Sequence, residues 1–454
     1  MSIVGSQERV LAGIAKERTS CRSCGEESLF DLLSLGDMCP VGFVENSEKK
    51  VVVKVPLTLC LCSNCRLVQL RHTTNPDLLY REWYGYRSGV NERMVADLEL
   101  ITKSAETIVK LKPGDIVLDI GCNDGTLLSK YSNRDIIRVG FDPARNVARY
   151  APEVLGEFGV KNYKIFFDFF SRLPFQKYFG DKKAKAVTAI SMFYDLDDPN
   201  GFLENVKIVL HPEGFLIIQQ NYLVEMLRQC AFDNICHEHL VYHSLSSLSK
   251  LLEKHGLEIF DVTTSEINGG SFRTYVRHKD SNVTVNGGKE RVRLMLKNEK
   301  NIGLLAEDVK VYERFIQKVQ KNTKVLREFV EREVKQGKKI YIYAASTRGN
   351  TILQFVGLDS KLITAAAERN PDKWGRRIVG TNIPIVSESE ARVSHPDYFL
   401  VLPWFLRDSF IKREKKYLES GGKMIFPLPE VEVVGMEGKQ IMSLFLKSKN
   451  ADKK

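Results

Sequence analysis

Val117-Leu-Asp-Ile-Gly-Cys-Asn-Asp-Gly125 is the most informative segment of this sequence. An apolar run typical of a buried strand ends in Asp119, and Gly121 and Gly125 bracket the turn that follows. Glycines let the backbone approach a ligand closely. Asp142 ends the next apolar run, where an acid can bind both hydroxyls of a ribose. This layout predicts a cofactor with a ribose and a cationic head but no pyrophosphate.

The motif differs from the dinucleotide pattern, which needs glycines two and five positions after the first. Asn123 and Thr126 occupy those positions after Gly121. The D-x-G-x-x-x-G form instead resembles motif I of the class I S-adenosylmethionine (SAM) methyltransferases. That resemblance implies that an acid at the end of the second strand binds the ribose and that an acid after the third strand binds the adenine. It also implies that the end of the fourth strand lies near the reactive methyl group. The implied SAM ligands are Asp119, Gly121, Asn123, Gly125, Asp142, Asp168 and Ser191.

Two of these acids have simpler alternatives. Asp168 follows the third predicted strand and can equally be a surface acid in a turn. Asp142 can be an acid at a strand end without a special role. The two acids together with motif I are far more specific than any of them alone.

Two C-x-x-C pairs, Cys21-Arg-Ser-Cys24 and Cys62-Ser-Asn-Cys65, stand in the N-terminal part of the chain. Four thiolates match a tetrahedral structural zinc site. Cys60 is a nearby alternative ligand, although its spacing to Cys62 is too tight for the usual knuckle. The alternative of four unrelated buried cysteines leaves the doubled spacing unexplained. Because a four-thiolate site has no open position, we expect zinc to support folding rather than catalysis.

The alternation of apolar runs and helical patterns over residues 73–283 predicts an α/β domain with a parallel sheet. Two late strands, joined by a turn at 268–270, are expected to form an antiparallel edge. A helical pattern over 304–336 leads to a second, Rossmann-like α/β domain. The predicted strands are 115–120, 137–141, 163–167, 185–191, 214–219, 258–266 and 271–277 in the first domain, and 339–345, 361–367, 397–402 and 423–427 in the second. The predicted division is a small zinc-binding domain (1–72), a class I SAM methyltransferase core (73–283), a helical bridge (284–338) and a C-terminal Rossmann-like domain (339–454).

The composition is that of an ordinary globular protein, because 43% of the 454 residues are hydrophobic and 27% are charged. No apolar run reaches the roughly 18 residues of a membrane helix, and Met1–Glu8 lacks the apolar core of a secretory signal. The nine cysteines fit metal ligands and free thiols in a reducing compartment. We therefore expect a cytoplasmic protein without a membrane partner.

The net charge of +10 fits nucleic acid, a small polyanion such as a nucleotide diphosphate, or plain solubility. Much of the Lys and Arg lies among Glu in residues 286–339, which is typical of a solvated helix face. No arginine–aromatic RNA motif is present. We therefore expect no nucleic-acid partner.

Phe232-Asp-Asn-Ile-Cys-His-Glu-His-Leu-Val-Tyr-His243 concentrates three histidines and two acids in one short segment. Its spacing does not match the H-E-x-x-H of a hydrolytic zinc enzyme. General acid–base chemistry is the better interpretation, because histidine titrates near neutral pH and Glu238 can tune a neighbouring imidazole. His237, Glu238 and His239 are therefore candidate catalytic residues. The alternative is that this segment caps the following helix, expected over 244–255.

Taken together, these motifs resemble those of the sugar C-methyltransferase family of deoxysugar pathways, which combines a zinc domain, a SAM core and a second α/β domain. The resemblance covers about residues 20–435 and also rests on Asn268-Gly-Gly-Ser-Phe-Arg273 and Ala344-Ala-Ser-Thr-Arg-Gly-Asn350. It implies methylation at carbon 3 of a nucleotide-diphosphate 4-keto-6-deoxysugar through an enolate. It also implies that Glu238 and His239 line the sugar, with His239 as the base or proton shuttle.

The chain departs from the family pattern at two positions. Asp195 stands where the antibiotic-pathway enzymes carry a His, and Cys236 stands where they carry a Tyr. If that His or Tyr polarises the 4-oxo group, the acceptor here is a different sugar or a hydroxyl group. O-methylation needs only a base, which His239 or Asp195 would supply. Tyr84 and Tyr86, in a segment that covers SAM and sugar in the family, are candidate acids, with aromatic packing as the alternative.

Ala344–Asn350 follows a predicted strand and precedes a helical run. A small-residue loop at a helix N-terminus is a natural anion site. We predict that Arg348 and Asn350 bind the diphosphate of the substrate and that Trp404 stacks on its base. The alternative is a degenerate Rossmann-like module that serves only packing.

The sequence therefore predicts a SAM-dependent methyltransferase of a nucleotide-diphosphate sugar, with SAM and structural zinc as cofactors. Carbon is the favoured acceptor and oxygen the alternative, and the protein is expected to be a monomer or a homodimer. A zinc-ribbon protein that modifies nucleic acid is a less favoured class, which the net charge permits. A non-catalytic scaffold is disfavoured because motif I is intact.

Overall fold

The computed structural model describes residues 13–40, 42–45, 53–81, 84–438 and 440–447. The chain forms two compact units. Unit 1 comprises residues 1–30, 60–224 and 238–307, and unit 2 comprises residues 31–59, 225–237 and 308–454. The chain therefore passes between the units five times. The four predicted domain ranges stay a prediction, and the first 72 residues are shared between the two units.

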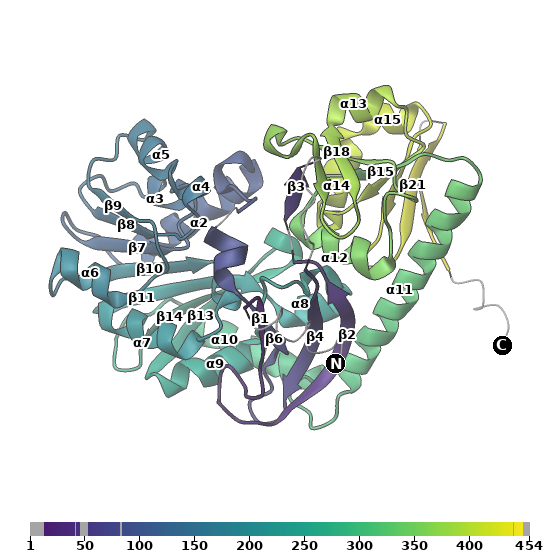
Figure 1. The fold of residues 1–454 in the computed structure, drawn as a ribbon. Coiled ribbons are helices and arrows are strands. Elements are labelled where there is room, and N and C mark those ends of the chain that lie inside the picture. Colours follow the sequence, from purple (N-terminus) through teal and green to yellow (C-terminus); the bar gives the residue numbers. More distant parts are fainter. Residues whose placement is uncertain (1–12, 41, 46–52, 82–83, 439, 448–454) are drawn as a thin grey trace. The chain divides into compact units, whose positions relative to one another are not determined.

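Unit 1 contains a seven-stranded sheet of order β13-β14-β11-β10-β7-β8-β9 (Figure 1). The five strands from β7 to β11 run parallel, and β14 is antiparallel to β11 and to β13. The predicted parallel sheet with an antiparallel edge is thus confirmed. The strands are β7 (Ile116–Ile120), β8 (Ile137–Phe141), β9 (Tyr163–Phe166), β10 (Ala184–Ile190), β11 (Leu210–Asn221), β13 (Leu257–Ser265) and β14 (Ser271–His278).

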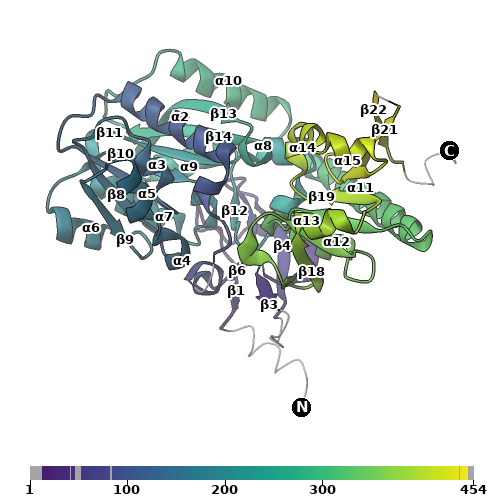
Figure 2. The same ribbon diagram turned by 90° about the horizontal axis from the view of Figure 1, so that it is seen from above.

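Helices lie on both faces of this sheet (Figures 1 and 2). Helix α2 (Glu92–Ile108) begins at Asn91, whose side chain accepts from the backbone N–H groups of Arg93 and Met94. Its apolar face, with Leu98 and Ile101, packs into a core shared with α3 and α5. The other helices of unit 1 are α3 (Thr126–Ser129), α4 (Arg145–Ala148), α5 (Ala151–Glu157), α6 (Arg172–Phe179), α7 (Pro199–Val209), α9 (Leu245–Lys254) and α10 (Gly288–Asn301).

Short strands surround the cysteine pairs in unit 1. Strand β1 (Ala15–Glu17) pairs antiparallel with β6 (His72–Thr74), and β5 (Val68–Leu70) pairs antiparallel with β12 (Val241–Tyr242). The second pairing ties the segment after the second cysteine pair to the segment after Glu238 and His239. Three elements continue from one unit into the other along the chain, namely β2 (Leu29–Met38), β4 (Val55–Cys62) and α8 (Leu223–Arg228).

Unit 2 contains a nine-stranded sheet of order β22-β21-β20-β19-β15-β16-β18-β17-β3. Its four predicted strands are confirmed, although β16 begins at Ala365 rather than at residue 361. The N-terminal strand β3 closes one edge by pairing antiparallel with β17. The strands are β3 (Phe43–Glu45), β15 (Ile340–Tyr343), β16 (Ala365–Glu368), β17 (Arg376–Ile378), β18 (Ile383–Ser387), β19 (Tyr398–Val401), β20 (Lys423–Phe426), β21 (Glu432–Glu437) and β22 (Gln440–Phe445).

The helix predicted over residues 304–336 is shorter than expected. Helix α11 (Lys310–Lys335) begins after the apolar residues Leu304, Leu305 and Val309. Gly303 has a φ of 84°, a conformation that terminates helices, so a turn separates α10 from α11. The remaining helices of unit 2 are α12 (Thr347–Val356), α13 (Glu388–Val393), α14 (Arg407–Arg413) and α15 (Lys415–Glu419). Within the described ranges, no helix combines the length and the apolar character needed to cross a bilayer.

Candidate active site and zinc site

A cavity of about 290 Å³ opens in unit 1 where β7, β8 and β10 end. Its lining includes Asp119, Gly121 and Asn123 from the motif after β7, Asp142 after β8, and Ser191 after β10. Ligands of open α/β sheets bind in this crevice, beyond the carboxyl ends of the strands. The cavity therefore brings together five of the seven side chains predicted to bind SAM.

The backbone of motif I explains its glycines. Gly121 has a φ of 77°, and a Cβ at this position would lie 3.0 Å from Cγ of Met192. Gly125 has a φ of 78°, and its Cβ would lie 2.9 Å from Cβ of Ala151 in α5. Gly121 therefore keeps the cavity open, whereas Gly125 allows close packing of α3 on α5 and does not itself line the cavity.

Two carboxyl groups face the cavity in unlike surroundings. Asp142 accepts 2.8 Å hydrogen bonds from the backbone N–H groups of Asn123 and Ala144, and burial raises its pKa to about 6. Asp119 accepts a 2.5 Å hydrogen bond from the Thr188 hydroxyl, and burial raises its pKa to about 7. At neutral pH Asp119 is therefore about half-ionised and Asp142 is mostly ionised, and a cationic ligand would favour the charged form of each.

The third predicted acid lies elsewhere. Asp168 is exposed, and its carboxylate accepts a 2.8 Å hydrogen bond from the Phe169 backbone N–H. The next residues, Phe169 and Phe170, line the cavity together with Phe141. The sequence pattern predicted an acidic adenine ligand at this position. The aromatic residues that follow Asp168 were the sequence signal for the residues that line the cavity here.

The segment before α2 is tied to motif I. Asn123 accepts a 2.9 Å hydrogen bond from the Ser88 N–H and donates one of 3.1 Å to the Tyr86 carbonyl. The buried Asp124 accepts from the side chain of Arg87 at 3.1 Å and from the N–H of Gly89. These contacts fix the segment over the cavity, and its predicted residues Tyr84 and Tyr86 are part of the lining.

A cluster of acids and phenols adjoins the cofactor crevice. Asp195 ends the 3-10 helix η3 (Phe193–Asp195) and is hydrogen-bonded to Tyr80 of the π-helix η1 (Asp77–Arg81). The Tyr80 hydroxyl lies 3.4 Å from the carbonyl oxygen of Glu238, and the Tyr80 and Tyr84 rings are 5.8 Å apart. Tyr80 was not predicted, because its role depends on neighbours distant in the sequence.

Burial controls the ionisation of this cluster. It raises the pKa of Glu238 to about 7. It raises the pKa of Asp195 well above the usual range, and the negative charge of Glu238 adds to that effect. Burial likewise holds the pKa of Tyr80 and that of Tyr84 well above their usual value. At neutral pH the cluster therefore holds protons that it can donate.

The two predicted histidines differ in placement. His239 is 9% exposed, and its ring meets the Tyr194 ring edge-to-face with 4.5 Å between centroids. The hydrogen bond from the Leu70 N–H to the Leu240 carbonyl, 2.9 Å long, anchors this loop to β5. His237 belongs to unit 2, where its Nε2 lies 3.0 Å from the Val55 carbonyl oxygen.

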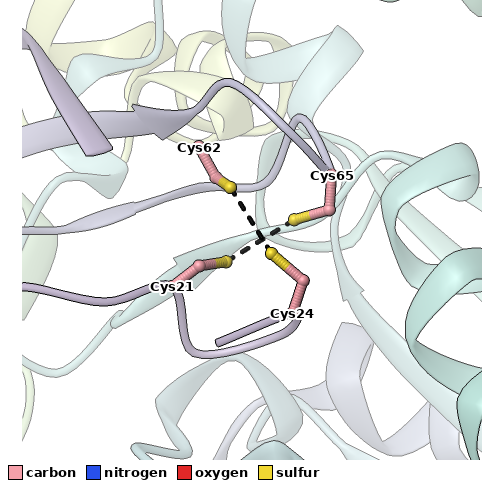
Figure 3. A group of neighbouring side chains, drawn as sticks. All are labelled: Cys21, Cys24, Cys62 and Cys65. Atoms are coloured by element: carbon pink, nitrogen blue, oxygen red, sulfur yellow. Dashed lines mark hydrogen bonds between the residues drawn. The ribbon is translucent and has the colours of Figure 1, made fainter. Parts of the chain in front are cut away.

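The four cysteines of the two C-x-x-C pairs point toward one another (Figure 3). Their sulfur atoms all lie within 4.8 Å of each other, with 3.5 Å between Cys21 and Cys65 and 3.6 Å between Cys24 and Cys62. Four converging thiols of this kind fit a tetrahedral zinc ion. Cys60 is buried but is not part of the group.

The cysteine cluster packs against the two loops that contain predicted catalytic residues. Tyr194, next to Asp195, and Val241, two residues after His239, pack against the cluster in one apolar core. A metal at this place would therefore support the loops that carry the acids and the histidine.

Arg22 of the first cysteine loop reinforces this support. Its guanidinium donates to the Leu70 carbonyl at 2.6 Å, to the Thr73 hydroxyl at 2.6 Å and to Asp197 at 3.1 Å. Asp197 lines the cavity, and Arg22 itself is only 2% exposed. The cysteine loop is therefore bonded to the loop that follows Asp195.

The predicted substrate ligands of unit 2 meet at one acid. Arg348 pairs with the buried Asp233 at 2.9 Å, and the Trp404 indole N–H donates to the same carboxylate oxygen at 3.1 Å. Asn350 is buried and donates to the Val379 carbonyl at 3.3 Å. Trp404 is 3% exposed, and its ring meets the Phe405 ring edge-to-face.

Three family models match successive parts of the chain. A zinc binding domain matches residues 21–80, a methyltransferase domain matches residues 88–262, and a C-methyltransferase C-terminal domain matches residues 266–429. C-methyltransferase NovU from Streptomyces niveus is 30% identical over 426 residues, which are 93% of this chain and 99% of NovU.

Solved methyltransferase structures resemble part of the chain. A SAM dependent methyltransferase from Aquifex aeolicus has a TM-score of 0.30 at 19% identity, over 40% of this chain and 97% of its own. The plantazolicin methyltransferase BpumL in complex with SAH has a TM-score of 0.31 at 15% identity, over 39% of this chain and 81% of its own.

The matches along the whole chain agree with the geometry of unit 1. The methyltransferase domain covers the motif I cavity, and SAM is the cofactor of this fold. The zinc binding domain covers the four converging cysteines, and zinc is the metal that suits them. The chain therefore belongs to the family of SAM-dependent C-methyltransferases that carry an N-terminal zinc-binding domain.

Proposed function

We propose that this enzyme methylates a carbon next to the keto group of a nucleotide-diphosphate sugar. The observation that carries the proposal is the cluster of proton-holding acids and phenols beside the cofactor crevice. Tyr80 is hydrogen-bonded to Asp195 and lies 3.4 Å from the backbone carbonyl oxygen of Glu238, and the charge of Glu238 acts on Asp195. A carbon acid needs a base to remove its proton and a donor to stabilise the resulting charge. A simple hydroxyl acceptor needs only the base.

In this proposal His239 removes the proton from the carbon beside the ketone. Its shielded position against Tyr194 limits contact with water, and the anchor to β5 holds its loop in place. Glu238, with a pKa of about 7, hydrogen-bonds the sugar or the imidazole and accepts the proton onward. Bound SAM supplies the electrophilic methyl group that the enolate carbon takes, which leaves S-adenosylhomocysteine (SAH).

Unit 2 supplies the proposed ligands of the nucleotide diphosphate. Helix α12 begins at Ser346, whose hydroxyl accepts a 3.1 Å hydrogen bond from the Gly349 N–H. Arg348 is the cation in this turn, and its pairing with Asp233 is the contact that a phosphate would have to compete with. Asn350 and Trp404 complete the proposed set.

Hydrogen–deuterium exchange tests the proposal directly. The enzyme with SAH in D₂O is incubated with the dTDP, GDP and CDP forms of 4-keto-6-deoxyglucose, and the sugar is analysed by NMR. We expect deuterium at the carbon beside the ketone in one of the three, and methylation of that carbon when SAM replaces SAH. Methyl transfer to oxygen without any exchange would establish the alternative, an O-methyltransferase. The observation behind this alternative is that Asp195 stands where the family carries a His.

A matched pair of histidine variants controls the exchange. His239→Gln is expected to lose exchange and methylation by about 10²-fold or more, the usual range for a general base. His395→Asn changes an exposed histidine of unit 2 at a turn with positive φ, which Asn tolerates. Full activity of His239→Gln would remove His239 from the proposed mechanism.

A further inference from the structure

Asp195 and Tyr80 form a pair that proton removal by His239 does not use. Both side chains line the cavity, and they are hydrogen-bonded to each other. The Oδ1 atom of Asp195 is buried and has no hydrogen-bond partner within the described part of the chain. Buried polar atoms are almost always paired, so an unpaired oxygen beside a binding cavity points to a contact that a ligand completes.

The surroundings of Asp195 determine whether its carboxyl group donates a hydrogen bond to the ligand or accepts one from it. The titratable groups that act on its carboxyl are Glu238, through its charge, and Tyr80, through the hydrogen bond. Two neighbouring carboxyl groups in a buried site cannot both ionise, and burial disfavours the charged form of either one. Asp195 therefore holds its proton near neutral pH, and a carboxylic acid that holds its proton is a hydrogen-bond donor.

We infer that Asp195 and Tyr80 together form an oxyanion hole. The hydrogen bond between them opens when the substrate binds, and each O–H then donates to the substrate oxygen on which the enolate charge collects. The inference rests on the proposed function, because it assigns a task within that reaction. A phenol beside a protonated aspartic acid is the arrangement with which ketosteroid isomerase stabilises the same kind of charge. Donors already in place before the charge develops are among the largest contributions to catalysis.

The proton and electron count is complete without a further reactant. His239 takes the proton of the carbon, and the electron pair of that bond moves onto the carbonyl oxygen, which the two donors stabilise. The pair returns to form the new carbon–carbon bond as the carbon–sulfur bond of SAM breaks. Asp195 and Tyr80 end with the protons with which they began, and the proton on His239 passes through Glu238 to solvent.

Two substitutions of Asp195 distinguish a role as hydrogen-bond donor from a role as base. In Asp195→Asn the amide can still donate a hydrogen bond but cannot ionise, whereas Asp195→Leu removes the donor. We expect kcat on the exchanging keto sugar to fall about 10-fold in the first and about 10²–10³-fold in the second, as for loss of an oxyanion-hole donor. Equal losses in both would show that Asp195 acts as a base and would overturn the inference.

Tyr80→Phe tests the second donor. We expect kcat to fall about 10²-fold, with the affinity for SAM, measured by calorimetry, changed less than about 2-fold. If the two residues act as a unit, the Tyr80→Phe/Asp195→Leu double variant loses little more than the worse single variant. Fully multiplicative losses, or a loss below about 3-fold in Tyr80→Phe, would contradict a joint role. Asp181→Asn and Tyr178→Phe, at exposed positions, serve as matched controls.

Infrared spectroscopy tests the donor state without any sugar. The difference spectrum between the SAH complexes of the wild type and Asp195→Asn at pH 7 is expected to contain the C=O band of a protonated carboxylic acid. A carboxylate band in its place overturns the inference even if the enzyme methylates keto sugars. Failure of the wild type to exchange or methylate any keto sugar instead overturns the proposed function, so the two failures are distinct.

Discussion

Asp142 links the sequence motif to a measurable pH dependence. Its two oxygens already accept backbone N–H groups, and their remaining lone pairs are available for the ribose hydroxyls. Because the ionised form is the better acceptor and the pKa is about 6, SAM affinity is expected to fall as the pH drops through about 6. Calorimetric titration between pH 5 and pH 8 measures this dependence.

The matched substitution isolates the contribution of this carboxyl. Asp142→Asn should weaken SAM binding about 10-fold or more at pH 8 and remove most of the slope, since two hydrogen bonds to a charged group are lost. Asp181→Asn should retain both the affinity and the slope. An unchanged slope in Asp142→Asn would assign the titration to another acid, with Asp119 next in line.

Arg348 supplies the test of substrate binding in unit 2. Arg348→Ala is expected to raise the KM for the keto sugar about 10-fold with little change in kcat, because a charge-assisted phosphate contact contributes about 1.5–3 kcal/mol. The same change leaves the buried Asp233 without its cation, which also destabilises unit 2. Asp233→Asn breaks the ion pair but keeps the guanidinium and is therefore the control. If both variants change KM equally, the pair has only a structural role.

At the residue scale, the sequence identified those site residues whose role depends on their immediate neighbours in the chain. Asp119 and Gly121 were identifiable because motif I is local. Tyr80 was not, because its partners Asp195 and Glu238 are more than 100 residues away. No periodicity in one chain indicates such a pairing.

At the scale of elements, Arg22 bonds the first cysteine loop to Asp197, in the loop that follows Asp195 and lines the cavity. Arg22→Met keeps the four thiols but leaves Asp197 and the Thr73 hydroxyl without this donor. We expect faster amide hydrogen exchange over residues 193–197 and a kcat reduced about 10-fold or more, with zinc content unchanged. Arg18→Met is the control, because Arg18 meets Asp197 only at 3.5 Å in a partly exposed pair, which contributes roughly 0–1 kcal/mol. Equal exchange rates in both variants would contradict the role of Arg22.

Strands with apolar, buried runs were predictable and strands without them were not. β7 and β15 are buried along their whole length and were identified. β17 has only three residues, which are too few for a pattern. The apolar residues of β22 do not alternate with polar ones, and all six of its residues are exposed. Pairing holds both in the sheet: β17 pairs with the distant strand β3, and β22 pairs with β21, the strand that precedes it in the sequence.

At the scale of the whole molecule, removal of zinc should affect catalysis more than cofactor binding. The cysteine cluster packs against Tyr194 and Val241, in the loops that contain the proposed catalytic residues, whereas motif I lies in the separate core of the seven-stranded sheet. Chelation is therefore expected to abolish methyl transfer while the SAM dissociation constant changes less than about 3-fold. Zinc release is followed with a metal indicator and SAM binding by calorimetry. Loss of SAM binding in step with zinc release would show that the two sites form one cooperative structure.

The two α/β sheets were predictable from periodicity, whereas the interleaving of the two units was not. Residues 31–59 belong with the C-terminal half of the chain, although their own sequence resembles the rest of the cysteine-rich region. Hydrophobic patterns show which faces are buried but not which distant segment covers them.

The pairing of β3 with β17 sets an order of events during synthesis on the ribosome. Phe43 leaves the exit tunnel about 330 residues before Arg376, which at roughly 5–20 residues per second is roughly 20–60 s. The seven strands of the large sheet in unit 1 are all synthesised by residue 278, well before β17. Strand β3 is therefore exposed without its partner while the cofactor-binding sheet forms, and a nascent-chain chaperone would have this segment within reach throughout that interval.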